Sequence, residues 1–363
     1  MKKDKLLLYI FYAVGILGLG VFIVTKNEYL MSKATETMYD DGDLYRFGKV
    51  RHFKVPMPGY EFLDEEFSTE NLDTVQVFMI GDSFLESCRG HQAIPVQLSE
   101  ALDERVYPVQ AGDSTRYFNP IYFFKKEGIT NSRPRVLILE RVERYIVDEF
   151  IDPFDEDPST TPQVASAEVG SGLAAFERRW FTDAEKNYEI LLTSSSVTAP
   201  IIEVWNTMCF SVLGRISEKV PVYSLSPPFL FYDEEVVQGK TTSFYYPHTD
   251  SLIAQIADNV AAISSALKEQ YNTDLLFMPI PNAYTLYHTF INNDQYDGFV
   301  PRLESALEER GVKVVKLYQK YVDTKDILYF PTDSHWNAQG VAIALEETLS
   351  ELRRMRWPGA IND

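Results

Sequence analysis

The sequence contains few of the residues that build disulfide frameworks and metal sites. Only 2 cysteines and 5 histidines occur among its 363 residues. Two cysteines cannot hold a fold together as a disulfide framework, so a hydrophobic core must stabilise it. Cys88 and Cys209 could form one bridge in an oxidising compartment, and two buried free thiols are an equal alternative. The histidines show no metal-ligand spacing, and neither a metal nor a cofactor is predicted.

Basic residues are also scarce. Lys and Arg total 34 against 53 Asp and Glu, which gives a formal net charge of -19. A chain of this charge repels nucleic acid and other strongly anionic polymers. Nucleic acid is therefore not expected as a partner.

Long hydrophobic runs are absent except at the N-terminus. Residues 6–24 are uncharged, Lys2, Lys3 and Lys5 precede them, and Lys26 follows. Nineteen residues in a helix span roughly 28 Å, close to the hydrocarbon thickness of a bilayer. A secretory signal peptide has a shorter apolar region and a small-residue cleavage site, and neither is seen here.

We therefore expect an uncleaved, single-pass anchor at residues 6–24, with a buried core helix as the alternative. The positive-inside rule places residues 1–5 in the cytoplasm and the C-terminal domain in the periplasm or outside the cell. The predicted location is the inner (cytoplasmic) membrane.

The remaining chain divides into a connector and one large domain. Residues 25–70 are polar, carry Pro56, Pro58 and Gly59, and lack a sustained helical or strand period, as a juxtamembrane connector would. Residues 71–355 are predicted to form the domain. A segment from about 145 to 247 interrupts its pattern and is interpreted as an insertion beside the site.

Within the domain, short apolar runs alternate with longer helical stretches. Strands are predicted at Val75–Ile80, Arg105–Gln110, Val136–Leu139, Leu275–Pro279 and Val312–Leu317. Helices are predicted at 176–192, 201–213, Ser251–Tyr271, Pro301–Arg310 and Ala338–Met355. This alternation predicts an α/β fold with a doubly wound parallel sheet that is covered on both faces.

A serine directly follows the first predicted strand, in the sequence Gly81-Asp82-Ser83. This position is the carboxyl edge of the sheet, where open parallel sheets bind ligands. Gly81 permits a tight turn, and Ser83 would begin the next helix. Its own N–H is unpaired there and can stabilise an oxyanion.

A second candidate segment lies near the C-terminus, where Asp333 stands two residues before His335. A carboxylate in this position can orient the imidazole while the other ring nitrogen takes a proton from a serine. Asn337 is a plausible N-cap of the following helix. The alternative interpretation is a surface loop with an isolated histidine. His91, His248 and His288 could line a cleft, and a surface or hydrogen-bonded histidine is the alternative for each.

These residues resemble the SGNH (GDSL) hydrolase superfamily, and in particular the branch of the alginate O-acetylation proteins and similar cell-envelope acyltransferases. The motif Asp333-Ser334-His335-Trp336 is similar to the Asp-x-His-Trp of that branch. The Pro-rich stretch 277–287 and the stretch 138–145 resemble two further segments of these proteins. The resemblance implies a flavodoxin-like sheet and a catalytic triad of Ser83, His335 and Asp333.

The resemblance also implies an oxyanion hole. Gly112 would give its second N–H, and an ordinary glycine turn is the alternative for this residue. Many members supply a third donor from an Asn after the third strand, but no Asn occurs between Val136 and Asp148. Arg144 is the candidate substitute for that donor. In the alginate proteins the Asp-His motif precedes the serine, whereas in this chain it follows.

The leading functional hypothesis is a cell-envelope polysaccharide O-acetyltransferase or acetylesterase that works through an acyl-serine. The implied partners are a polysaccharide or glycan substrate and a multi-pass membrane protein that donates the acyl group. A carboxylesterase acting on small esters is one alternative. A non-catalytic glycan-binding or assembly protein with a vestigial site is another. Aromatic residues could stack on sugar rings, with packing in a core as the alternative, namely Tyr245, Tyr246, Trp180 and Trp205.

Overall fold

The computed structural model describes residues 2–35, 40–60, 72–86, 89–110, 119–153, 184–357 and 360. The chain divides into two compact units. Unit 1 comprises Met1–Pro56 and Pro162–Ser217, and unit 2 comprises Met57–Thr161 and Glu218–Asp363.

Unit 2 contains a parallel sheet of five strands in the order β2-β1-β3-β6-β7. These strands are β1 (Val77–Gly81), β2 (Val106–Gln110), β3 (Arg135–Val142), β6 (Thr273–Ile280) and β7 (Lys313–Val314). The order is that of flavodoxin-like folds, so the predicted doubly wound sheet is confirmed. Every residue of β1 and β3 is buried, as expected for central strands covered on both faces. Between β1 and β3 the winding direction changes, and such points bind ligands in these sheets.

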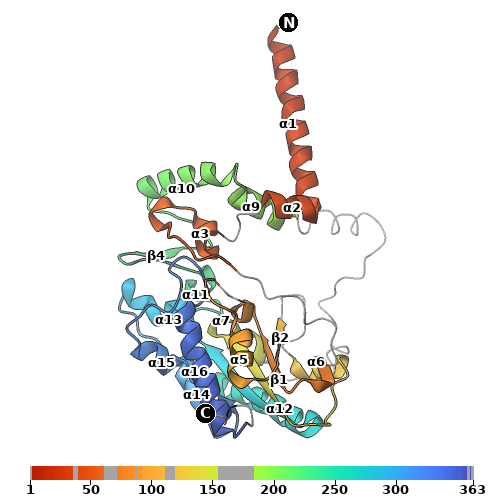
Figure 1. Ribbon diagram of the computed structural model, residues 1–363. Helices are drawn as coiled ribbons and strands as arrows, with labels where there is room; N and C mark the ends of the chain where they lie inside the picture. The colour runs from red at the N-terminus through yellow and green to blue at the C-terminus, as the bar shows by residue number, and fades with distance from the viewer. Residues whose placement is uncertain are drawn as a thin grey trace. The chain divides into compact units, whose positions relative to one another are not determined.

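Alternate residues of the central strands enter two separate hydrophobic cores. Met79 joins the core formed with α5 (Ile94–Leu102) and α16 (Ala338–Arg354). Phe78 joins the core on the other face, which the elements α6 (Pro120–Lys126), α12 (Asp250–Tyr271) and α14 (Phe299–Glu309) cover (Figure 1). The period of two along β1 therefore fixes which helices lie on which face.

The predicted strands and helices occur among the described residues, and most of their ends are shifted by a few residues. The helix predicted at 176–192 is observed as Ala184–Ser194, and residues 176–183 lie outside the described residues. Strand β7 is shorter than predicted, with Val312–Leu317 expected and Lys313–Val314 observed. Val315 and Leu317 are still fully buried, although they lie outside the strand. The apolar run at residues 312–317 therefore indicates that these side chains are buried, and it does not indicate how far the strand pairing extends.

Short elements complete unit 2. They are η4 (Leu72–Thr74), α4 (Ser83–Glu86), α7 (Glu143–Phe150), the hairpin β4 (Val222–Leu225) and β5 (Pro228–Phe231), α11 (Asp233–Val236), α13 (Ala283–Tyr287), η5 (His288–Phe290) and α15 (Tyr318–Asp323).

The predicted insertion at 145–247 was too wide at both ends. Ile146 and Val147 of α7 are buried in one core of unit 2, and Phe229, Phe231 and Phe244 are buried in the other. Only residues 162–217 of this segment belong to unit 1.

Unit 1 contains the helices of the N-terminal region together with two from this segment. They are α1 (Lys2–Lys26), α2 (Glu28–Ala34), α3 (Asp43–Gly48), η2 (Arg51–Phe53), α9 (Ala184–Ser194) and α10 (Ala199–Leu213). Residues 25–70 are therefore not a plain connector, because Tyr45 and Phe53 in this stretch are buried side chains.

The residues predicted as a membrane anchor lie within the single helix α1. In the part of the chain that the structure describes, no single helix is both long and apolar enough to span a bilayer, and the apolar part of α1 is Phe11–Lys26. Asn187–Ser194 and Ala199–Leu213 satisfy the length and composition criteria only as a pair, with an 85° bend between them. The anchor at residues 6–24 stays a prediction.

Candidate active site

Ser83 lies at the first position of α4, immediately beyond the carboxyl end of β1, and its side chain is exposed. Gly81 is needed there for space rather than for a positive φ. A Cβ on Gly81 would overlap Oε2 of Glu140 on the neighbouring strand and lie 2.8 Å from Cγ of Leu85. The close approach of β1 and β3 therefore requires glycine two residues before the serine.

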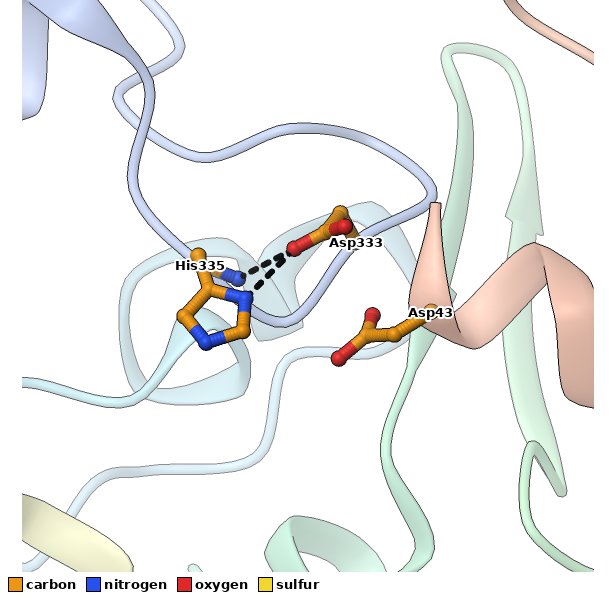
Figure 2. Close-up of side chains that lie close together, drawn as sticks. All are labelled: Asp43, Asp333 and His335. Atoms are coloured by element: carbon orange, nitrogen blue, oxygen red, sulfur yellow. Dashed lines mark hydrogen bonds and ion pairs between the residues drawn. The ribbon is translucent and has the colours of Figure 1, made fainter. Parts of the chain in front are cut away.

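The structure brings Ser83, His335 and Asp333 together. Nε2 of His335 lies 2.8 Å from Oγ of Ser83, and Nδ1 of His335 lies 2.6 Å from Oδ1 of Asp333. The backbone N–H of His335 donates to the same Asp333 oxygen at 3.1 Å, so two bonds fix the carboxylate against the histidine (Figure 2). This geometry assigns the proton of the neutral ring to Nδ1, which leaves Nε2 free to accept the serine proton.

Backbone pairing holds the loop that carries His335. Tyr329 and Trp336 form an antiparallel bridge, and the N–H of Phe330 donates to the carbonyl of His335 at 3.1 Å. Asn337 caps α16, as predicted, by accepting from two N–H groups of its first turn. The buried Trp336 packs against Phe84, the residue after the serine, with ring centroids 5.4 Å apart. The Trp of the motif thus ties this loop to the serine turn.

Arg89 is a site residue that sequence analysis missed. Its Nε lies 3.1 Å from Oδ2 of Asp333, the oxygen that does not face His335, and both side chains are buried. Arg89 pairs with Tyr60 through a β-bridge, and its guanidinium lies over the Tyr60 ring. No sequence pattern marks Arg89, because it lies 244 residues from its partner.

A buried charged group lies directly behind the serine turn, at the ends of β1 and β3. The Asp82 N–H donates to Oε2 of Glu140 at 2.9 Å, and the Asp82 carboxylate pairs with Arg141 at 3.0 Å. Arg141 also pairs with Glu149. Burial, followed by repulsion from Asp82, raises the pKa of Glu140 well above its usual range. Burial raises the pKa of Glu149 to about 8, against the opposing effect of Arg141.

The two predicted oxyanion residues have different outcomes. Gly112 lies outside the described residues. Arg144 is buried, and its guanidinium pairs with the buried Glu235 at 3.1 Å. Glu235 in turn accepts from the N–H of Tyr284 at 3.0 Å. These contacts use Arg144 to connect α7 with α11, and none of them supports a role at Ser83.

The Pro-rich stretch 277–287 has a structural role at the same edge of the sheet. The carboxylate of Glu143 accepts from the N–H of Asn282 at 2.8 Å, the hydroxyl of Thr285 at 2.7 Å and the hydroxyl of Tyr296 at 2.7 Å. This buried group joins the ends of β3 and β6.

The other histidines have local partners away from the triad. His248 pairs with Asp297 at 2.9 Å and stacks on Phe299. His288 contacts the carbonyl of Thr285. Cys209, on α10, is a free thiol, and Cys88 lies outside the described residues.

Residues 226–362 match the family described as the SGNH hydrolase-like domain of the acetyltransferase AlgX. The matched segment contains Asp333 and His335, whereas Ser83 precedes it. No curated protein matches the chain. The resemblance to SGNH hydrolases of the alginate O-acetylation branch is thus confirmed, for residues 226–362.

Proposed function

We propose that unit 2 is a serine-dependent enzyme that moves an acetyl group onto or off a cell-envelope polysaccharide. The observation that carries the proposal is the 2.8 Å contact between Ser83 Oγ and His335 Nε2, with Asp333 on the opposite ring nitrogen. The choice of an acetyl group and of a polysaccharide substrate in this proposal rests on the match to the AlgX family.

In the acylation step, Oγ of Ser83 attacks the acyl carbonyl carbon of the donor, and its proton passes to Nε2 of His335. Asp333 stabilises the imidazolium that forms. The tetrahedral intermediate then collapses, the bond to the leaving group breaks, and His335 returns the proton to that group. The product is an acetyl ester on Ser83.

In the second step, a sugar hydroxyl or water gives its proton to His335 and attacks the acetyl carbon of the acyl-serine. The bond between that carbon and Oγ of Ser83 then breaks, and His335 returns the proton to Oγ. Attack by a sugar yields the O-acetylated polysaccharide, and attack by water yields acetate. Which acceptor dominates depends on how the site excludes water and binds the sugar. Both outcomes regenerate Ser83 and use the same three residues.

Stabilisation of the oxyanion is assigned to backbone donors. The N–H of Ser83 is at the first position of a helix, where no acceptor from a preceding turn exists. Gly112 is proposed as a second donor on the basis of the family resemblance. Arg144 has no role in this mechanism, because its guanidinium forms an ion pair with the buried Glu235.

We further propose that the enzyme works at the outer face of the inner (cytoplasmic) membrane, held by residues 6–24. A tethered enzyme can receive acyl groups from a multi-pass membrane donor protein. The basic residues before Leu6 support this orientation. A reporter fused after Asp363 should be active only outside the cytoplasm, and a cytoplasmic signal would reject the orientation.

The chemistry is tested with the purified full chain in detergent. Cleavage of p-nitrophenyl acetate and transfer of acetyl groups to an oligosaccharide are measured for the wild type and for Ser83→Ala. Ser305→Ala, on the exposed face of α14, is the matched control. The proposal requires both reactions to be lost only in Ser83→Ala. A wild type without either reaction, whose glycan affinity is the same in Ser83→Ala, would instead indicate a binding protein.

A further inference from the structure

Helix α10 exposes its apolar side chains. Ile201, Val204, Trp205, Met208 and Val212 are all exposed, with Met208 the least exposed at 50%. Their spacing places them along one side of the helix. We call these five residues the α10 face. An apolar stripe of this length normally packs into a core.

The opposite side of α10 carries its only charge, which is turned inward. Glu203 is the one buried residue of this helix. It accepts hydrogen bonds from Tyr45 at 2.8 Å, Arg51 at 3.0 Å and Lys54 at 3.0 Å. Asn206 donates to the carbonyl of Gly48 on the same side.

These polar contacts fix the rotation of α10 about its axis. Turning the α10 face inward would move Glu203 toward solvent, remove its three hydrogen bonds and leave the buried hydroxyl of Tyr45 without its acceptor. The outward direction of the apolar face is therefore built into unit 1, and something apolar must cover that face for the arrangement to be favourable.

The same unit presents apolar side chains on α1. Among the described residues, all the exposed large apolar side chains lie in unit 1 except Leu225, Val237 and Val322. Helices α9 and α1 are in contact, and Asn187 donates to the carbonyl of Thr25 at 2.9 Å. Two apolar surfaces on one compact unit fit a single extended apolar environment better than two separate protein partners.

The charges of the chain favour a membrane as that environment. Acidic and basic residues nearly balance in unit 1, so the formal net charge of -19 falls almost entirely on unit 2. An anionic lipid surface repels unit 2 but not unit 1. Trp205 at the middle of the α10 face is also a side chain that favours the membrane interface.

We propose that the α10 face lies in the interfacial layer of a lipid bilayer, as a second membrane contact beside α1. In this position the helix runs along the membrane surface, with its five apolar side chains in the lipid and Glu203 on the protein side. The inference rests on the proposed membrane attachment and not on the chemistry of Ser83. It predicts that the contact of α10 with lipid restricts how unit 1 can tilt relative to the bilayer.

Depth-dependent quenching tests the contact in the full chain. Cys88 and Cys209 are replaced by serine, and one new cysteine is introduced by Met208→Cys, by Leu17→Cys on α1, or by Val322→Cys on α15. Each variant is labelled with a fluorophore and reconstituted into phosphatidylcholine and phosphatidylglycerol vesicles whose acyl chains carry spin labels. Val322 is the matched control, because its exposed fraction, 50%, equals that of Met208.

The proposal requires lipid quenching at positions 208 and 17 and none at position 322. Quenching at 17 alone would leave the anchor in place and overturn the α10 contact. Absence of quenching at both 17 and 208 would overturn the anchor and the contact together. A label at 208 that is shielded from aqueous iodide but not quenched by lipid would overturn the lipid contact and show that protein covers the face.

Discussion

In unit 2, large apolar side chains fill two cores on either face of the sheet, whereas in unit 1 many of those described face outward. The charged groups differ too. Unit 2 buries Glu140, Glu143 and Glu235 at the carboxyl edge of its sheet, and unit 1 buries Glu203 beneath an apolar helix face. Unit 2 thus keeps its large apolar side chains inside and gathers buried carboxylates at one edge of its sheet, whereas unit 1 leaves apolar side chains exposed and buries a carboxylate.

The largest predicted effect separates the two units by function. Ser83→Ala or His335→Ala should lower the rate of ester cleavage by about 10⁴-fold or more, because the two side chains act together in the same step. Asp333→Asn should cost on the order of 10⁴-fold, since it would favour the wrong tautomer of His335. Initial rates on p-nitrophenyl acetate measure this. Membrane attachment, followed by vesicle flotation, should be unchanged, and loss of both properties in one variant would mean that the units are not independent.

A matched pair of tryptophans tests the difference in packing. Trp336 is fully buried against Phe84 in unit 2, whereas Trp205 in unit 1 is exposed. Trp336→Ala should lower the free energy of unfolding by about 3–5 kcal/mol because it leaves a large cavity. Trp205→Ala should change it by less than about 0.5 kcal/mol in detergent. Chemical denaturation measures the free energy of unfolding of both variants. Equal losses in the two variants would contradict the proposed difference in packing between the units.

A smaller effect is expected at the carboxyl group behind the serine turn. Burial, followed by repulsion from Asp82, raises the pKa of Glu140 well above its usual range, which favours the protonated form of this side chain. Glu140→Gln should therefore keep both the stability and the acceptor for the Asp82 N–H. Glu140→Ala leaves that buried N–H without its acceptor and should cost about 1–3 kcal/mol. Thermal unfolding of the two variants is the measurement, and a large loss in Glu140→Gln would mean that Glu140 is ionised.

The smallest effect concerns the pH dependence of unit 1. Burial alone would raise the pKa of Glu203, but hydrogen bonds from Lys54, Tyr45 and Arg51 lower it to about 2, against an ordinary value of 4.5. The stabilisation is then complete above pH 4.5 and is lost as the pH falls toward 2. We expect a loss of about 1–2 kcal/mol, because Arg51 and Lys54 are largely exposed to solvent.

Amide hydrogen exchange in α10 at pH 6 and pH 3 reports on this loss. Glu203→Gln should exchange faster than the wild type at pH 6 and respond less to acid. If the change from pH 6 to pH 3 reduced the protection of the α10 amides equally in both proteins, the Glu203 carboxylate would not hold the helix.

The sheet of unit 2 could be predicted from the sequence because buried parallel strands are continuous apolar runs, as at Val77–Ile80. The meeting of Ser83 with Asp333 and His335 follows from that topology, since both motifs lie where chain segments return to the carboxyl edge of one sheet. Local patterns were sufficient for these features.

Features that depend on contacts distant in the sequence could not be predicted. Arg89 contributes to the site only through Asp333, and the helices of the predicted connector depend on Glu203, about 150 residues away. Helix α3 is only 6 residues long, too short to show a period. The sequence did not reveal Glu235, the buried ion-pair partner of Arg144, and the role of Arg144 as a third oxyanion donor stays a prediction.

Direct trapping of the acyl-enzyme tests the central claim. The full chain is mixed with a slowly hydrolysed acetyl ester, quenched in acid, digested and analysed by tandem mass spectrometry. The mechanism predicts one acetyl group on Ser83 that accumulates in the wild type and in Ser305→Ala and is absent from Ser83→Ala. Ester turnover by the wild type with no acetyl group on Ser83, or with the same turnover in Ser83→Ala, would contradict it.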